Sequence, residues 1–166
     1  MRLRIAAAAA LLMATSAAAL ELHAFKSGSW RDIQNATAGK PAIVHIWSLT
    51  CGTCLVELPE WGKFAAAHPG TRFVLINWDR KTDAPDKIAA ALTNAGLGHV
   101  ENWVLGDGFS DKLRFELDPN WLGEMPYTRL IGSAGGTADF SGTSDFEMIA
   151  RWIASQPAAN AVTSEP

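Results

Sequence analysis

Hydrophobic and polar positions follow two patterns along the chain, one typical of buried strands and one typical of helices. Nearly continuous apolar runs at residues 42–47 and 72–78 predict strands that are buried on both faces. Between them, apolar residues recur at the spacing of one helix face, at Leu55, Leu58, Trp61, Phe64 and Ala65. This spacing predicts a helix from the cysteines at positions 51 and 54 to about His68, with a kink at Pro59.

Further elements lie on both sides of this unit. Residues 20–23 predict a short edge strand and residues 29–37 a short helix. The second half predicts helices at 84–95, 110–117 and 144–155, a strand at 102–105, and a hairpin of strands 127–131 and 137–140. Strands and helices that alternate in this way predict one α/β domain, residues 20–155.

The two ends of the chain do not fit this domain. Arg2 and Arg4 precede an apolar run at residues 5–14, and small residues at 17–19 match a signal-peptidase site. Because the run is too short to span a membrane well, we expect residues 1–19 to be a cleaved signal peptide and the protein to be periplasmic and soluble. Residues 156–166 are small and polar, and we expect them to form a disordered tail.

Composition narrows the class of protein. The chain is 48% hydrophobic and has seven tryptophans, which is enough to build a core without disulfide staples. The formal net charge is −3, and removal of residues 1–19 leaves 12 basic and 17 acidic residues, a net charge of −5. Because no basic run occurs, we expect no nucleic-acid partner.

The chain has two cysteines, Cys51 and Cys54, at the predicted junction between a strand and a helix. A disulfide that closes so short a loop adds little stability, so a redox role explains the pair better. Unpaired N–H groups at a helix N-terminus favour a thiolate, which makes Cys51 the expected nucleophile and Cys54 the resolving thiol. A structural zinc site would need a second pair of ligands, and the chain has no second C-x-x-C pair. A copper-binding metallochaperone that uses both thiolates is an alternative, but we expect no resident metal or cofactor.

The residues around this pair resemble the active-site segment of thioredoxin-like proteins. The closest group is the TlpA/ResA/CcmG-type exported thiol–disulfide reductases, whose pattern F-W-A-x-W-C-x-x-C-x-x-E-x-P is matched at Trp47, Cys51, Cys54, Glu57 and Pro59. Residues 123–127 resemble that family's loop before a cis-proline. The resemblance implies a thioredoxin-like fold with a central mixed β-sheet flanked by helices, and a cis peptide bond before Pro126.

The resemblance also implies an activity, partners and site residues. It implies a protein-disulfide reductase that receives electrons from a membrane thiol donor and passes them to protein disulfides, for example in cytochrome c maturation. A disulfide oxidase or isomerase on the same fold is the alternative. Pro126 and Glu57 join the cysteines as expected catalytic residues. Glu57 lies one helical turn after Cys54, so its carboxylate could exchange a proton with that thiol.

Some residues differ from the family's usual ones. Thr50 replaces a tryptophan before the first cysteine, and Met125 precedes the proline where valine or threonine is common. Together with Trp121, they are expected to line the substrate groove. His45 occupies a position that is aspartate in thioredoxin. We interpret it as a hydrogen-bonded core residue, with a proton relay beneath the disulfide as the alternative. Asp79 follows a strand, where a capping or surface role is expected.

Overall fold

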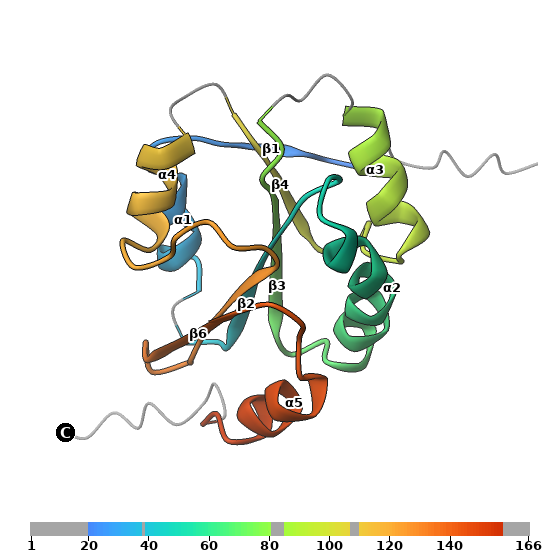
Figure 1. Ribbon diagram of the computed structural model, residues 1–166. Helices are drawn as coiled ribbons and strands as arrows, with labels where there is room; N and C mark the ends of the chain where they lie inside the picture. The colour runs from blue at the N-terminus through green and yellow to red at the C-terminus, as the bar shows by residue number, and fades with distance from the viewer. Residues whose placement is uncertain (1–19, 38, 81–84, 107–109, 158–166) are drawn as a thin grey trace, which may run out of the picture.

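A computed structural model describes residues 20–37, 39–80, 85–106 and 110–157 (Figure 1). The predicted signal peptide, residues 1–19, and residues 158–166 of the predicted tail lie outside these ranges. Six strands form one mixed sheet in the order β1-β4-β3-β2-β5-β6. The strands are β1 (His23–Phe25), β2 (Ala42–Trp47), β3 (Arg72–Asn77), β4 (Glu101–Leu105), β5 (Tyr127–Ile131) and β6 (Thr137–Ser141). The first four strands of this order are parallel, whereas β5 runs antiparallel to β2 and to β6.

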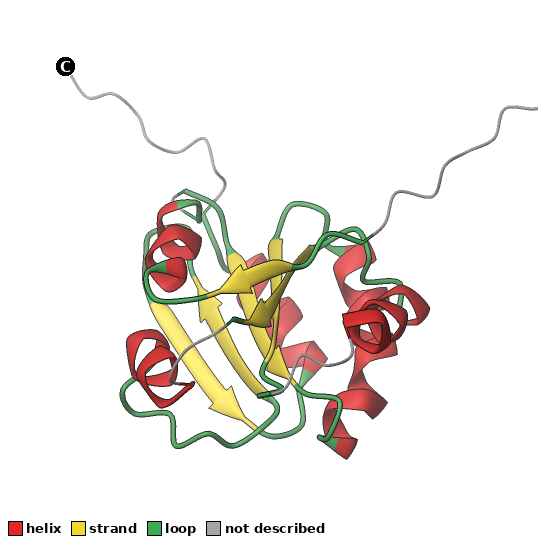
Figure 2. Ribbon diagram, turned by 90° about the horizontal axis from the view of Figure 1, so that it is seen from above, coloured by secondary structure: helices red, strands yellow, loops and turns green. Residues whose placement is uncertain are grey.

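Helices cover both faces of the sheet (Figures 1 and 2). They are α1 (Ser29–Asn35), α2 (Gly52–Ala67), α3 (Pro85–Asn94), α4 (Ser110–Leu117) and α5 (Phe146–Ala154). Side chains from α1 and α4 join one buried cluster, and side chains from α2, α3 and α5 join the other. Strand β2 serves both, since Val44 and Ile46 lie in the first cluster and Ile43 and Trp47 in the second. This explains its nearly continuous apolar sequence.

Helix α2 packs closely on the end of α3, and Gly62 permits this approach. A Cβ atom at position 62 would lie 1.7 Å from the carbonyl oxygen of Ala95, far inside van der Waals contact. Pro59 lies on the exposed side of α2 and does not end the helix. Helix α2, whose first turn contains Cys54, is therefore held in place by its packing against both the sheet and α3.

The predicted elements are all present, and the main difference is at the N-terminal strand. The strand comprises residues 23–25 instead of 20–23, because Leu20 and Leu22 pack against the second cluster instead of pairing with β4. The first residues of the predicted tail continue the structure, since the Gln156 N–H donates to the Ile153 carbonyl oxygen. Within the described ranges, no helix has the length and apolarity that a membrane crossing requires.

Candidate active site around Cys51 and Cys54

Cys51 and Cys54 lie where the chain leaves β2 and enters α2. Cys51 is the N-cap of α2, with an extended backbone, and its Sγ accepts the N–H of Cys54 at 3.1 Å. The two sulfurs form a disulfide bond, with the Cα atoms 5.2 Å apart. Cys54 is fully buried, whereas Cys51 is partly exposed. A partner molecule can therefore reach the sulfur of Cys51 more readily than that of Cys54.

The electrostatic surroundings of Cys51 favour a thiolate after reduction. Unpaired N–H groups and the helix dipole place partial positive charge at the start of α2. The first turn of α2 contains no acidic residue that would offset this charge. A thiolate at the N-cap position is stabilised by such an environment, and Cys51 is the residue that occupies it.

A carboxylate from the neighbouring strand fixes the segment that precedes Cys51. Asp79, just after β3, accepts hydrogen bonds from the Ser48 hydroxyl and from the Leu49 N–H, the latter at 2.8 Å. The Ser48 hydroxyl oxygen in turn accepts the N–H of Thr50 at 3.0 Å. The Cys51 N–H donates to the Ser48 carbonyl oxygen at 3.2 Å. The connection between β2 and α2 is thus tied to the end of β3.

The loop before β5 lies on the other side of the site, and its peptide bond between Met125 and Pro126 is cis. The cis bond expected from the family resemblance is therefore confirmed. Trp121 does not line a surface groove. Its side chain is 3% exposed, stacks on Tyr127 with ring centroids 4.8 Å apart, and donates its indole N–H to the Glu124 carbonyl oxygen. The expectation for Trp121 is wrong, because the ring supports the loop from the core.

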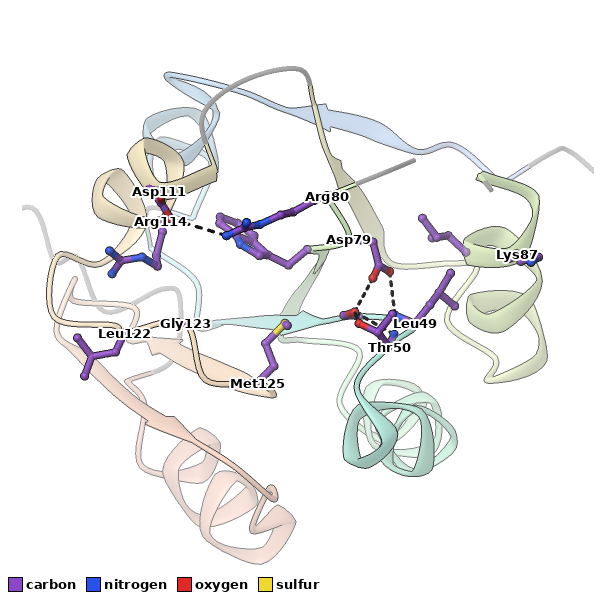
Figure 3. Close-up of a pocket in the computed structure, with 13 residues that line it drawn as sticks. Leu49, Thr50, Asp79, Arg80, Lys87, Asp111, Arg114, Leu122, Gly123 and Met125 are labelled. Atoms are coloured by element: carbon purple, nitrogen blue, oxygen red, sulfur yellow. Dashed lines mark hydrogen bonds and ion pairs between the residues drawn. The ribbon is translucent and has the colours of Figure 1, made fainter. Parts of the chain in front are cut away.

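A pocket of about 840 Å³ opens between these two segments (Figure 3). Thr50 and Met125 both line it, and Met125 points into the space opposite Leu49 and Thr50. That the pocket is the substrate groove stays a prediction. Leu122, which is 81% exposed, lines the pocket where Trp121 was expected. Charged residues complete the lining, namely Asp79, Arg80, Lys87, Asp111 and Arg114. Thr50, which lines this pocket, is the residue directly before Cys51.

Solved structures with a similar fold include proteins described as disulfide oxidoreductases. A secreted Mycobacterium tuberculosis disulfide oxidoreductase homologous to E. coli DsbE matches with a TM-score of 0.57 and 20% identity, over 72% of this chain and 84% of that one. A thiol:disulfide interchange protein of the thioredoxin family from Chlorobium tepidum matches with a TM-score of 0.58 and 16% identity, over 73% and 82%. This chain has the thioredoxin-like fold. StoA from Bacillus subtilis has a TM-score of 0.51 and 21% identity, over 69% and 83%.

No family model and no curated protein sequence matches the chain, so the comparison depends on structure. At these identities, the likeness establishes the thioredoxin-like fold. The activity of this chain must be inferred from its own residues.

Glu57 is a buried link between α2 and the start of the C-terminal helix. Its carboxylate accepts the Ser144 N–H at 2.7 Å and the Ser144 hydroxyl at 3.1 Å. The residue is 5% exposed, and these donors satisfy both of its oxygens. A structural role is thus established by the contacts, and the exchange of a proton with Cys54 stays a prediction.

His45 lies on β2, in the centre of the sheet of the thioredoxin-like fold. Its Nδ1 is 3.0 Å from the Thr128 hydroxyl oxygen on β5, and its ring lies 4.6 Å from that of Trp61 on α2. Burial lowers the pKa of His45 to about 3, so the imidazole is neutral at neutral pH. Its Nε2 has no partner among the described residues. These contacts agree with the interpretation as a core residue.

The two cysteines are the only cysteines of the chain, and the histidines do not gather near them to complete a metal site. Within the described ranges, no group of three or more His, Cys, Asp or Glu side chains could hold a metal ion. Asp79, for which the sequence predicts a capping or surface role, is the group that fixes the loop before Cys51. A polar residue directly after a buried parallel strand was the available signal, since strand ends of a parallel sheet meet at one edge.

Proposed function

We propose that this protein is an exported thiol–disulfide oxidoreductase that reduces disulfide bonds of other proteins. The observation that carries the proposal is the disulfide at the start of α2, with one accessible and one buried sulfur, beside a pocket that reaches the loop before Pro126. The fold is also that of known disulfide oxidoreductases.

The reaction begins with the reduced protein. The Cys51 thiolate attacks one sulfur of the partner's disulfide, the partner's S–S bond breaks, and its other sulfur leaves as a thiolate that takes up a proton. Cys54 then loses its proton and attacks the Cys51 sulfur of the mixed disulfide. The second partner thiol is released, and the Cys51–Cys54 disulfide forms. The partner gains two electrons, which the protein must regain from a dithiol donor.

Glu57 is the residue that we expect to accept the proton of Cys54, since it follows one helical turn later and is buried. A Glu57→Gln variant should keep the first step and slow the second. Rapid-quench measurement of mixed-disulfide lifetime against pH would check this, and an unchanged lifetime at every pH would contradict it.

The direction of electron flow can be measured directly. Equilibration of the protein with glutathione buffers gives its reduction potential, for which a reductase should have a value near that of thioredoxin, about −270 mV. A value near that of DsbA, about −120 mV, would instead make the protein an oxidant. Reduction of insulin disulfides by the wild type, with Cys51→Ser as the control, tests the activity itself.

Export is the part of the proposal that depends on residues 1–19. The basic start, apolar run and small residues before Leu20 support a cleaved signal peptide. In the periplasm, the electron donor would be a membrane protein with an exposed dithiol. Mass spectrometry of the protein from a periplasmic fraction should give a chain that begins at Leu20, and an intact N-terminus in the cytoplasmic fraction would contradict export.

A further inference from the structure

The connection between β2 and α2 is short, and a single carboxylate organises it. Asp79 binds two donors from this connection, the Ser48 hydroxyl and the Leu49 N–H, through its two oxygens. Ser48 in turn holds Thr50, because its hydroxyl oxygen accepts the Thr50 N–H and lies 2.8 Å from the Thr50 hydroxyl oxygen. The three residues before Cys51 therefore depend on a side chain from another strand.

Asp79 is itself anchored in the sheet. The buried side chain of Asn77 donates to the Asp79 carboxylate at 2.9 Å and accepts the Asp79 N–H at 3.2 Å. Asn77 lies opposite Trp47 in the pairing of β2 with β3, and the Trp78 N–H donates to the Trp47 carbonyl oxygen at 2.8 Å. The Asp79 carboxylate is thus held in place by β3 independently of its bonds to Ser48 and Leu49.

The donors that meet Asp79 are hydroxyl, amide and backbone groups, and no cation pairs with it among the described residues. Among these residues, its negative charge is stabilised by hydrogen bonds and not by an ion pair. The Asp79 carboxylate binds the N–H of Leu49, two residues before Cys51, and the thiolate form of Cys51 would be a second negative charge at the same loop. Like charges oppose each other's ionisation, so Asp79 acts against the helix dipole that favours the thiolate.

We infer that Asp79 is a positioning residue that fixes the Ser48–Thr50 segment and restrains the reactivity of the Cys51 thiol. This inference rests on the proposed function for its biological meaning. Asp79 would thereby influence the reduction potential of the Cys51–Cys54 pair, because a less stable thiolate makes the reduced protein the stronger reductant.

Other ionisable groups near the two cysteines do not contact this segment in the described part of the chain. Glu57 is bound by Ser144, and His45 is neutral and bonded to Thr128. The remaining charged residues that line the pocket come from the end of β3 and from α3 and α4, namely Arg80, Lys87, Asp111 and Arg114. Asp111 is 82% exposed and lies 4.0 Å from Arg80, which makes it a matched control for charge in the pocket.

The test is the rate at which iodoacetamide alkylates Cys51 in the reduced protein between pH 5 and pH 10. Asp79→Asn keeps the shape of the side chain and removes its charge. We expect the rate profile to move to lower pH, with alkylation at pH 7 roughly two- to fourfold faster, as expected for the loss of a nearby charge in a solvent-exposed setting. Asp111→Asn should leave the profile in place. An Asp79→Asn profile that stays in place, moves to higher pH, or moves no further than that of Asp111→Asn would overturn the inference.

A second variant tests the positioning independently. Ser48→Ala keeps the charge of Asp79 and removes the hydroxyl that connects it to Thr50. The pH profile of alkylation should then stay in place, while the rate of exchange with insulin disulfides falls roughly threefold or more, because the loop no longer has one conformation. An unchanged exchange rate would overturn the positioning role. Alkylation needs no partner protein, so a protein that fails to reduce any disulfide but shows the Asp79 effect would refute only the proposed function.

Discussion

Two segments flank the disulfide, and each depends on hydrogen bonds to one aspartate. Asp79 fixes residues 48–50 before Cys51, and Asp118 fixes the loop before Pro126. Asp118 is 3% exposed, accepts the Tyr127 hydroxyl, and pairs with Arg129 at 2.6 Å. Asp79 is only half-buried and has no cationic partner within the described ranges.

This difference in partners separates two uses of a carboxylate. Burial is the largest single influence on Asp118 and raises its pKa, but the donors from Tyr127, Asn120 and Arg129 together hold it below its usual value. Burial and the bond to Asp118 raise the pKa of Tyr127, so its hydroxyl stays a donor. The charge of Asp118 is cancelled inside the fold and contributes to stability. The charge of Asp79 faces the site and can influence the chemistry there.

The largest expected effect is the loss of the buried pair. Asp118→Ala leaves Arg129 without its buried partner, and the free energy of unfolding should fall by about 3–5 kcal/mol. Asp139→Ala removes the other partner of Arg129, which is 40% exposed, and should cost no more than about 1 kcal/mol. Urea unfolding of the two variants would check this. Equal decreases in the free energy of unfolding would show that the buried pair contributes no more than the exposed one.

A second prediction concerns His45, which joins the strands that carry the two segments. The unfolded chain binds a proton at this residue below about pH 6.5, whereas the folded protein binds it only near pH 3. The unfolded state therefore holds more protons in this window, and the free energy of unfolding should fall by about 1.4 kcal/mol per pH unit from pH 6 toward pH 4.

The matched variant for this slope is His45→Asn, which cannot titrate in the window. Urea unfolding at pH 7, 6 and 5 should show a shallower dependence on pH in the variant, whatever its absolute stability. The same slope in both proteins would mean that His45 does not control the acid response.

A smaller effect is expected in the loop before Pro126. Trp121→Phe keeps the stacking on Tyr127 and loses the hydrogen bond to the Glu124 carbonyl oxygen, which should lower the free energy of unfolding by about 1 kcal/mol. Leu122→Ala, in contrast, alters a side chain that is 81% exposed and should change stability by less than about 0.5 kcal/mol. Thermal unfolding with the reverse order of effects would place Trp121 at the surface after all.

A small effect on stability should also come from Asp79→Asn, in contrast to Asp118→Ala. Because the asparagine can keep hydrogen bonds to the segment and no ion pair among the described residues is lost, we expect a change of less than about 1 kcal/mol in the free energy of unfolding. A loss as large as that of Asp118→Ala would remove the distinction between the two aspartates.

The parts of the site that are local in sequence were predictable. The strand at 42–47, the cysteine pair and the helix after it follow one another, and their hydrophobic periods identify them. The cis bond before Pro126 came from family resemblance and not from periodicity.

The role of Asp79 was missed because its bonds to residues 48 and 49 span 30 or more positions and exist only once β2 and β3 are in register. Trp121 was misplaced because a loop residue is usually exposed. The rings that bury it, Tyr127 by stacking and Trp78 edge-on, are brought together by the sheet.

The central claim is that Cys51 attacks a partner's disulfide and Cys54 resolves the complex. The most direct test is to mix reduced Cys54→Ala protein with an oxidised protein substrate and to map the products by mass spectrometry. The account predicts a stable mixed disulfide through Cys51, and no such product from Cys51→Ala under the same conditions. A mixed disulfide that forms equally through Cys54, or none from either variant, would contradict it.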